Sequence, residues 1–285
     1  MWTSGGEKKN LMNDALTDLS RLSLNQATTQ HCSVREAAAG CVRAGIPFIG
    51  LWRDKVAATG LRESARIVRD AGLHVSSLCR GGWFPAATAA ERQAHIDDNR
   101  RAIDEASELG TDLLVLVCGP ASDRDIDAAR AQVAEGIAAI APYAAERGVR
   151  LGIEPLHPMF AGDRSVIVTL AEANQLAAQF SPEQVGVVID VYHVWWDPDV
   201  YHQIALAADR IFGFHVNDWL APPPDILKGR GMMGDGVIEL RRLRHAVEAA
   251  GYTGPIEVEI FNQDLWDRPG DEILDLMCSR YLNHV

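Results

Sequence analysis

The sequence lacks the features of exported, membrane-spanning and disulfide-stabilised proteins. Only five of its 285 residues are cysteines, and no two of them stand in a CxxC spacing, so we expect reduced thiols. The first residues contain no apolar signal segment, and no stretch approaches ~18 uninterrupted apolar residues. These absences predict a soluble, cytoplasmic protein that has no membrane partner.

Positive charge is scarce as well. Lysine and arginine number 27 against 39 aspartates and glutamates, which gives a net charge of −12. Nucleic acid is therefore an unfavourable partner, because the phosphates would meet a negative surface instead of exchanging counterions for basic side chains. No GxGxxG segment opens a helix after the first predicted strand, and neither a GxxxxGK[ST] nor a GxSxG motif occurs. The sequence thus offers no nucleotide-cofactor site and no serine nucleophile of the hydrolase type.

What the chain does have is a regular alternation of short apolar runs and longer segments with helical spacing. The predicted strands are Leu22–Thr29, Phe48–Trp52, His74–Arg80, Leu113–Gly119, Leu151–Pro155, Val185–Asp190, Ile211–Val216 and Pro255–Phe261. Ser33 with Glu36, and Thr88 with Glu91, have the spacing of capping boxes at helix starts. Eight such units fit an α/β chain folded as a single-domain (β/α)8 TIM barrel, which typically takes ~250 residues.

The barrel is expected over residues 21–285, preceded by an N-terminal arm at residues 1–20. A terminal helix is the alternative for those first residues. The longest predicted loop, Trp219–Asp235, follows the seventh strand, and long loops in compact domains are usually functional.

Four titratable residues stand at the ends of consecutive predicted strands: Glu154, Asp190, His215 and Glu259. Active sites of TIM barrels lie at these carboxyl ends. Three carboxylates and an imidazole in one quadrant would repel or take up protons unless a cation joined them. We therefore expect one divalent metal ion, and the ligand types suit Mn²⁺, Mg²⁺, Co²⁺ or Zn²⁺. Glu257 lies on the same face of its strand as Glu259 and competes with it for the ligand role; Glu259 is favoured because it is nearer the strand end.

Four segments of the chain resemble the metal-site motifs of the xylose-isomerase-like TIM-barrel superfamily. They are Ile153-Glu154-Pro155-Leu156-His157, Ile189-Asp190-Val191-Tyr192-His193, Gly213-Phe214-His215-Val216 and Glu257-Val258-Glu259-Ile260-Phe261. The nearest groups are sugar epimerases of the tagatose 3-epimerase type, hydroxypyruvate isomerases and inosose dehydratases. The resemblance implies that Glu154, Asp190, His215 and Glu259 hold the metal. It also implies that His193 and Arg230 contact substrate oxygens.

Three further residues are candidates for contact with the substrate. His157 lies within the first of the four segments, and Arg80 ends the third predicted strand. Arg80 suits a substrate carboxylate or hydroxyl, or alternatively neutralises an acidic rim. Trp52 ends the second predicted strand, where an indole either stacks on a sugar ring or caps the barrel mouth. His193 has a structural alternative too, because it lies among the aromatic residues Tyr192, Trp195 and Trp196.

The leading hypothesis is a divalent-metal-dependent isomerase or epimerase acting on a carbohydrate or polyol that carries a carbonyl group. Glu154 and Glu259 would be the catalytic base and acid, moving a carbon-bound proton through an enediolate. The alternative is a metal-dependent dehydratase of a keto-inositol or keto-sugar, which begins with the same proton abstraction. An apurinic-site endonuclease is disfavoured because the second, third and fourth predicted strands end without histidine ligands. The sequence leaves open whether the chain forms a homo-oligomer.

Overall fold

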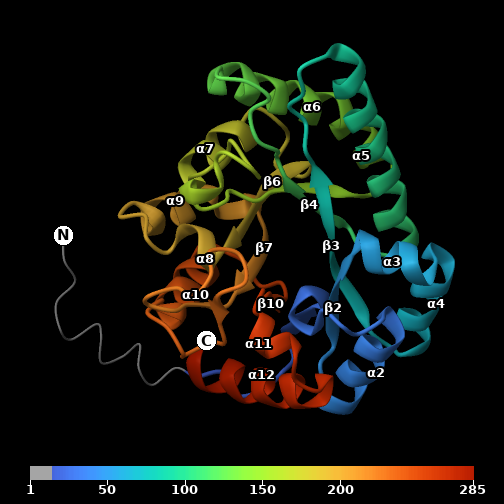
Figure 1. The fold of residues 1–285 in the computed structure, drawn as a ribbon, viewed down its shortest axis with the longest axis vertical. Coiled ribbons are helices and arrows are strands. Elements are labelled where there is room, and N and C mark those ends of the chain that lie inside the picture. The colour runs from blue at the N-terminus through green and yellow to red at the C-terminus, as the bar shows by residue number, and fades with distance from the viewer. Residues whose placement is uncertain (1–14) are drawn as a thin grey trace.

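A closed barrel of eight parallel strands forms the centre of the computed structural model, which describes residues 15–285 (Figure 1). The strands follow the order β1-β10-β7-β6-β5-β4-β3-β2 around the barrel. Their bounds are β1 Leu22–Asn25, β2 Phe48–Trp52, β3 His74–Gly82, β4 Leu113–Val117, β5 Arg150–Ile153, β6 Val185–Asp190, β7 Ile211–Val216 and β10 Ile256–Val258. The predicted single-domain TIM barrel is confirmed.

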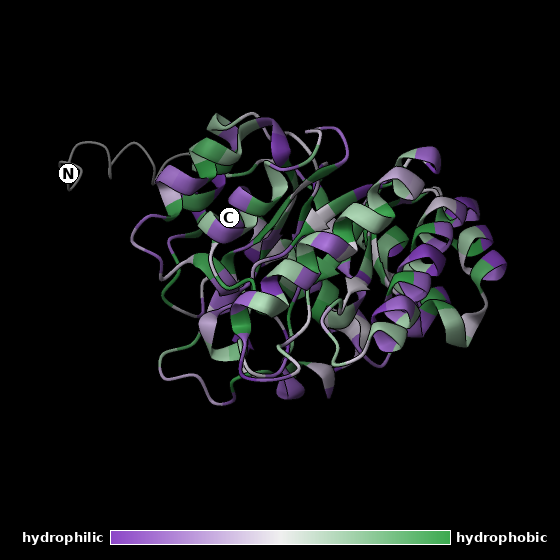
Figure 2. Ribbon diagram, turned by 90° about the horizontal axis from the view of Figure 1, so that it is seen from above, coloured by the Kyte–Doolittle hydropathy of each residue, from purple (hydrophilic) through white to green (hydrophobic). Residues whose placement is uncertain are grey.

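The helices surround the barrel and bury their apolar sides against it. Their bounds are α2 Val34–Ala44, α3 Arg53–Thr59, α4 Leu61–Asp70, α5 Ala89–Leu109, α6 Ile126–Glu146, α7 Leu170–Ala177, α8 Val191–Val194, α9 Val200–Ala207, α10 Leu240–Ala249, α11 Gln263–Trp266 and α12 Gly270–His284. Short 3-10 turns span η1 Gln26–Thr29, η2 Pro158–Phe160 and η3 Ala208–Arg210. Figure 2 shows hydrophobic strands inside and alternating polar and apolar turns on the outer helices.

Local capping explains where several helices begin. Both predicted capping boxes are present, with Ser33 starting α2 and Thr88 starting α5. In each box the hydroxyl accepts from the third amide of the helix while the glutamate carboxylate accepts from the cap amide. Thr169 starts α7 in the same way. Gly110 closes α5 with φ +77°, a conformation that costs glycine little.

Five strands, β1, β3, β4, β5 and β10, end at other residues than predicted, and the ends of β1 and β10 lie beside the candidate site. The first strand stops at Asn25, whose side chain accepts from the amide of Ala27 and turns the chain into η1. The last strand stops at Val258, so Glu259 follows it directly. Its amide still donates to Val216 O, 3.2 Å away, which fixes the glutamate at the end of β7.

The predicted long loop after β7 contains a small antiparallel ribbon of β8 (Asp218–Trp219) and β9 (Arg230–Gly231). This ribbon returns the chain toward the barrel mouth. The predicted N-terminal arm falls mostly outside the described residues and stays a prediction; residues 15–20 contain no helix. Within residues 15–285, no helix has the length and apolar character needed to cross a membrane.

Candidate metal centre and active site

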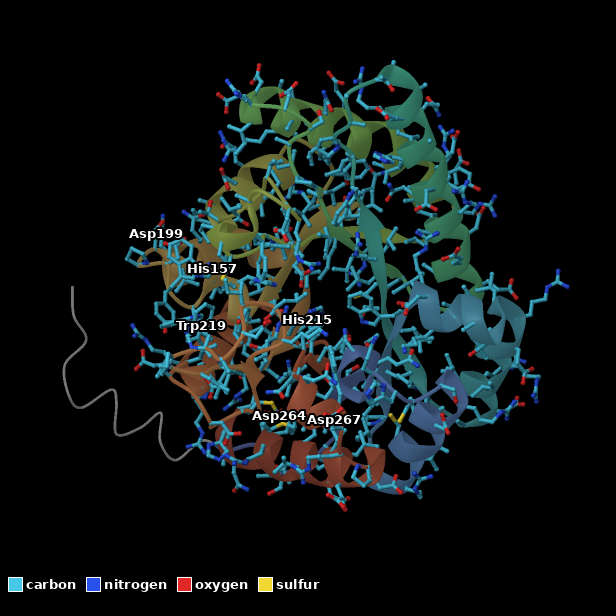
Figure 3. All side chains as sticks on the ribbon, viewed as in Figure 1. His157, Asp199, His215, Trp219, Asp264 and Asp267 are labelled. Atoms are coloured by element: carbon cyan, nitrogen blue, oxygen red, sulfur yellow. The ribbon has the colours of Figure 1, made fainter. Side chains whose placement is uncertain are left out.

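The four predicted metal ligands come together at the carboxyl end of the barrel. Glu154 follows β5, Asp190 ends β6, His215 lies near the end of β7, and Glu259 follows β10. One ligand atom from each residue lies within 4.8 Å of the others, and all four side chains are buried. His215 lies within the ring of strands in Figure 3.

The donor set fits a divalent cation. Two buried atoms that face each other, Glu154 Oε1 and His215 Nδ1, have no hydrogen-bond partner and are 3.4 Å apart. Glu259 Oε2 lies 4.0 Å from the same imidazole nitrogen. A buried polar atom without a partner is costly, and a cation shared by these atoms removes that cost.

The charges of the cluster shift the pKa values of its members strongly. Burial lowers the pKa of His215, but the carboxylates of Glu257, Glu154 and Glu259 raise it to about 10. Burial raises the pKa of Glu259 to about 8. The charge of Glu154 adds to this rise, and the charge of Arg230 opposes it. Burial alone would raise the pKa of Asp190, but Arg230, His193, His215 and the backbone amide of Tyr192 together outweigh it and lower the pKa to about 2. The cluster without metal therefore retains protons that a cation would displace.

Arg230, predicted to contact the substrate, lies against the metal cluster itself. Its Nη1 donates to Asp190 Oδ2 at 2.7 Å and to Glu259 Oε2 at 2.9 Å. The guanidinium is buried between the rings of Tyr192 and Phe261, 4.7 and 4.8 Å from their centroids. Arg230 thus contacts two of the predicted ligand carboxylates and also lines the cavity described below.

Two residues that the sequence analysis missed organise this side of the site. Asn217 Nδ2 donates to Asp190 Oδ1 at 2.9 Å and to Glu259 O at 3.1 Å, which ties β6 to β10. The buried Asp218 carboxylate accepts from the amides of Gly234, Gly236 and Ile238. It fixes the glycine-rich segment that follows the ribbon carrying Arg230. The signal in the sequence was their position two and three residues after His215.

Glu257 is buried on the other side of His215. Its Oε1 lies 3.7 Å from His215 Nε2, whereas the metal cluster faces Nδ1. Asn25, Ser76 and Ser77 all donate to its carboxylate, at 2.6, 2.6 and 3.0 Å. A Cβ at Gly50 would stand 2.2 Å from Glu257 Oε1, so a larger residue there would displace this carboxylate. Glu257 is thus outside the four-ligand cluster.

A cavity of about 190 Å³ opens beside the cluster. Six of the predicted site residues line it: Trp52, Arg80, Glu154, His193, Arg230 and Glu259. Asp190 and His215 do not. The four predicted metal ligands therefore divide into two glutamates that face the cavity and two residues behind them. Arg164 also lines the cavity, and the sequence analysis missed it because it lies in an irregular loop after η2. Another cavity, of about 380 Å³, lies at the strand starts, the end of the barrel where TIM-barrel active sites do not occur.

The two predicted histidine contacts have different positions. His193 is buried, lines the cavity, and its Nδ1 accepts from the backbone amide of His157 at 3.1 Å. Burial and the charge of Arg230 lower its pKa to about 3, against the effect of Asp190, so the ring is neutral. The His157 ring stacks on Trp219, with centroids 5.2 Å apart, and does not line the cavity. Figure 3 shows His157 and Trp219 next to each other, apart from His215.

The comparison with known proteins agrees with this geometry. Residues 38–279 match the family described as "Xylose isomerase-like TIM barrel". The chain belongs to this family.

Among curated relatives, the 3-dehydroshikimate dehydratase of Pseudomonas aeruginosa is 29% identical over 206 residues. The match covers 70% of this chain and 31% of that protein, so the chain spans about a third of the length of its relative. The crystal structure of protein SMc04130 from Sinorhizobium meliloti is 52% identical, with a TM-score of 0.92, and covers 94% of this chain and 99% of the other. The IolI protein with a bound zinc atom is 17% identical, with a TM-score of 0.81 over 91% of this chain and 96% of that one, and shares the fold.

Proposed function

We propose that the chain is a divalent-metal enzyme that removes a carbon-bound proton next to a carbonyl group. The observation that carries the proposal is the division of the cluster: Glu154 and Glu259 line the cavity, while Asp190 and His215 stand behind them. Bound by these four residues, a divalent cation would polarise a substrate carbonyl and acidify the neighbouring C–H bond.

The two cavity-facing glutamates supply the proton-transfer groups. One glutamate takes the proton from carbon, and either the other glutamate or the first one, now protonated, returns a proton. Arg230 and His193 face the same cavity and offer hydrogen bonds to substrate oxygens. Returning the proton to the other carbon of the enediolate gives isomerisation, and returning it to the opposite face of the same carbon gives epimerisation.

Dehydration is the second candidate, and the sequence relationship to a 3-dehydroshikimate dehydratase favours it. That reaction begins with the same abstraction, after which the neighbouring carbon loses its hydroxyl as water and a C=C bond forms. His193 and Arg230, which face the cavity, are the groups placed to assist the departing hydroxyl.

Turnover in D₂O tests the proposal and separates its two candidates. Metal-loaded protein is incubated with neutral ketoses, an inosose and 3-dehydroshikimate. We expect solvent deuterium on the carbon next to the carbonyl. An isomerase or epimerase places it in an isomeric product. A dehydratase places it in recovered substrate and also forms an unsaturated product. Glu154→Gln and Glu259→Gln should each abolish the exchange. Turnover without any solvent deuterium would contradict proton abstraction and favour hydride transfer.

A further inference from the structure

We propose that the substrate carries an anionic group and that Arg80 and Arg164 bind it. The inference rests on the proposed function, because it concerns the cavity that Glu154 and Glu259 line. Both arginines line that cavity, yet they come from different parts of the barrel. Arg80 lies in β3, and Arg164 lies in the loop after η2.

Arg80 is a partly buried cation that forms no ion pair within the described residues. Within residues 15–285, no carboxylate oxygen lies within 4 Å of its guanidinium, which rests on the ring of Trp83 at 4.1 Å. Burial and the positive charge of Arg164 both lower its pKa. Arg80 and Arg164 repel each other, and an anion bound by both would relieve that repulsion.

Arg164 is also incompletely satisfied. Its Nε is buried and has no hydrogen-bond partner. The nearest carboxylate, Asp163 Oδ2, is 3.7 Å away on a side chain that is 64% exposed, so water screens the attraction. The segment is nonetheless well fixed, because Gly119 N donates to Arg164 O at 2.9 Å and Val166 N donates to Gly119 O at 3.0 Å.

Two other arginines around the site, Arg230 and Arg53, differ in having close carboxylate partners. Arg230 is paired with Asp190 and Glu259. Arg53, whose charge also acts on Arg80, donates to both Asp98 and Glu105. Those carboxylates thus pair with other arginines. A bound anion would supply the close counter-charge that Arg80 lacks within residues 15–285 and that the exposed Asp163 gives Arg164 only weakly.

The chemistry of the pair defines the class of ligand. Guanidinium groups bind carboxylates and phosphates through paired hydrogen bonds, so both anions fit. The metal cluster of the same cavity suits a hydroxy-carbonyl group. The substrate class is therefore a hydroxy-ketone that bears a carboxylate or a phosphate. In a chain with a net charge of −12, a local cationic pair is needed to attract such a compound.

Matched ligand pairs test the inference by calorimetry on the metal-loaded protein. 3-Dehydroshikimate is compared with its methyl ester, and D-fructose 6-phosphate with D-fructose. We expect the anionic member of one pair to bind about 10- to 100-fold more tightly than its neutral partner. This factor is what a charge-assisted hydrogen bond typically contributes to affinity. The pair that shows the difference identifies the anion as carboxylate or phosphate. Arg80→Gln and Arg164→Gln should remove the advantage, while Arg164→Lys should retain part of it.

Arg62→Gln, on the exposed side of α4, is the matched control and should leave the advantage unchanged. Metal content, measured on every variant, should stay at the wild-type level, because neither arginine contacts a ligand carboxylate within 4 Å. Absence of an anion-dependent difference in both pairs, or its survival in both glutamine variants, would overturn the inference. Deuterium exchange into a neutral ketose alone would support the proposed function while rejecting the anionic substrate. Anion binding that depends on the two arginines, without deuterium exchange, would support the anionic ligand while rejecting the proposed function.

Discussion

Glu257 Oε1 lies 3.7 Å from His215 Nε2, on the side of the imidazole that faces away from the metal cluster. When Nδ1 holds a cation, the ring carries its proton on Nε2, which points to this carboxylate. A carboxylate in that position orients a metal-binding histidine and increases its basicity. Asn25 connects the carboxylate to the cavity wall, because its side-chain amide also accepts from Trp52 Nε1 at 2.8 Å.

Replacing Glu257 with glutamine should weaken metal binding about 10- to 100-fold, since the histidine loses its charged partner. The measurement is a competition titration with a chelator of known affinity. Glu146→Gln, at an exposed position of α6, is the matched control and should bind metal as the wild type does. Unchanged affinity in Glu257→Gln would show that Glu257 only fills the barrel interior.

The wild-type protein should contain about one divalent metal per chain, because the four ligands converge on one site. Elemental analysis after dialysis measures the content. Glu259→Gln removes one charged ligand and should lower both metal content and activity. Three metals per chain, or a Glu259→Gln protein equal to the wild type in both respects, would refute the ligand assignment.

Removing the guanidinium of Arg230 should destabilise the metal-free protein. Arg230→Met leaves the ionised Asp190 carboxylate buried without its cation and removes a hydrogen bond from Glu259, whose raised pKa keeps it protonated at neutral pH. The loss of one partner from a buried ion pair typically costs about 3–5 kcal/mol. Urea unfolding of metal-free protein measures the change, with Arg62→Met as the exposed control. Metal should restore most of the stability, since it supplies the missing positive charge.

Activity should remain low in the metal-loaded variant because the cavity has lost a hydrogen-bond donor. Loss of metal content in Arg230→Met would instead mean that the arginine assembles the ligands.

The site could be predicted from sequence where strand periodicity controls position. Glu154, Asp190, His215 and Glu259 each come at the end of an apolar run, and parallel strands in a barrel bring such ends together. Periodicity alone could not choose between Glu257 and Glu259 as the ligand, but the strand register separates them. β10 ends at Val258, so Glu259 lies at the barrel mouth, while Glu257 pairs in register with His215 and lies on its Nε2 side.

Residues outside this periodicity gave no comparable signal. Asn25 ends its strand early because its side chain caps the following turn, and a single asparagine in an apolar run does not predict this. Arg164 reaches the cavity through a loop that is fixed by backbone pairing with Gly119, a contact between segments far apart in the sequence. The position of the His157 ring on Trp219 likewise depends on how two loops meet.

Metal affinity should increase with pH. In the metal-free protein the pKa values of His215 and Glu259 are raised, to about 10 and about 8, so both groups hold protons at neutral pH. A cation has to displace these protons, and the cost of doing so falls as the pH rises toward each pKa. Asp190 does not contribute, because its pKa is lowered to about 2 and it is already ionised. Calorimetric titration with metal at pH 6, 7 and 8, in buffers of different ionisation enthalpy, should show tighter binding at each step and proton release. In Glu259→Gln fewer protons should be released per metal ion bound, because the Glu259 carboxyl no longer contributes one. Binding that is independent of pH, with no protons released, would mean that these two groups are not protonated before the metal binds.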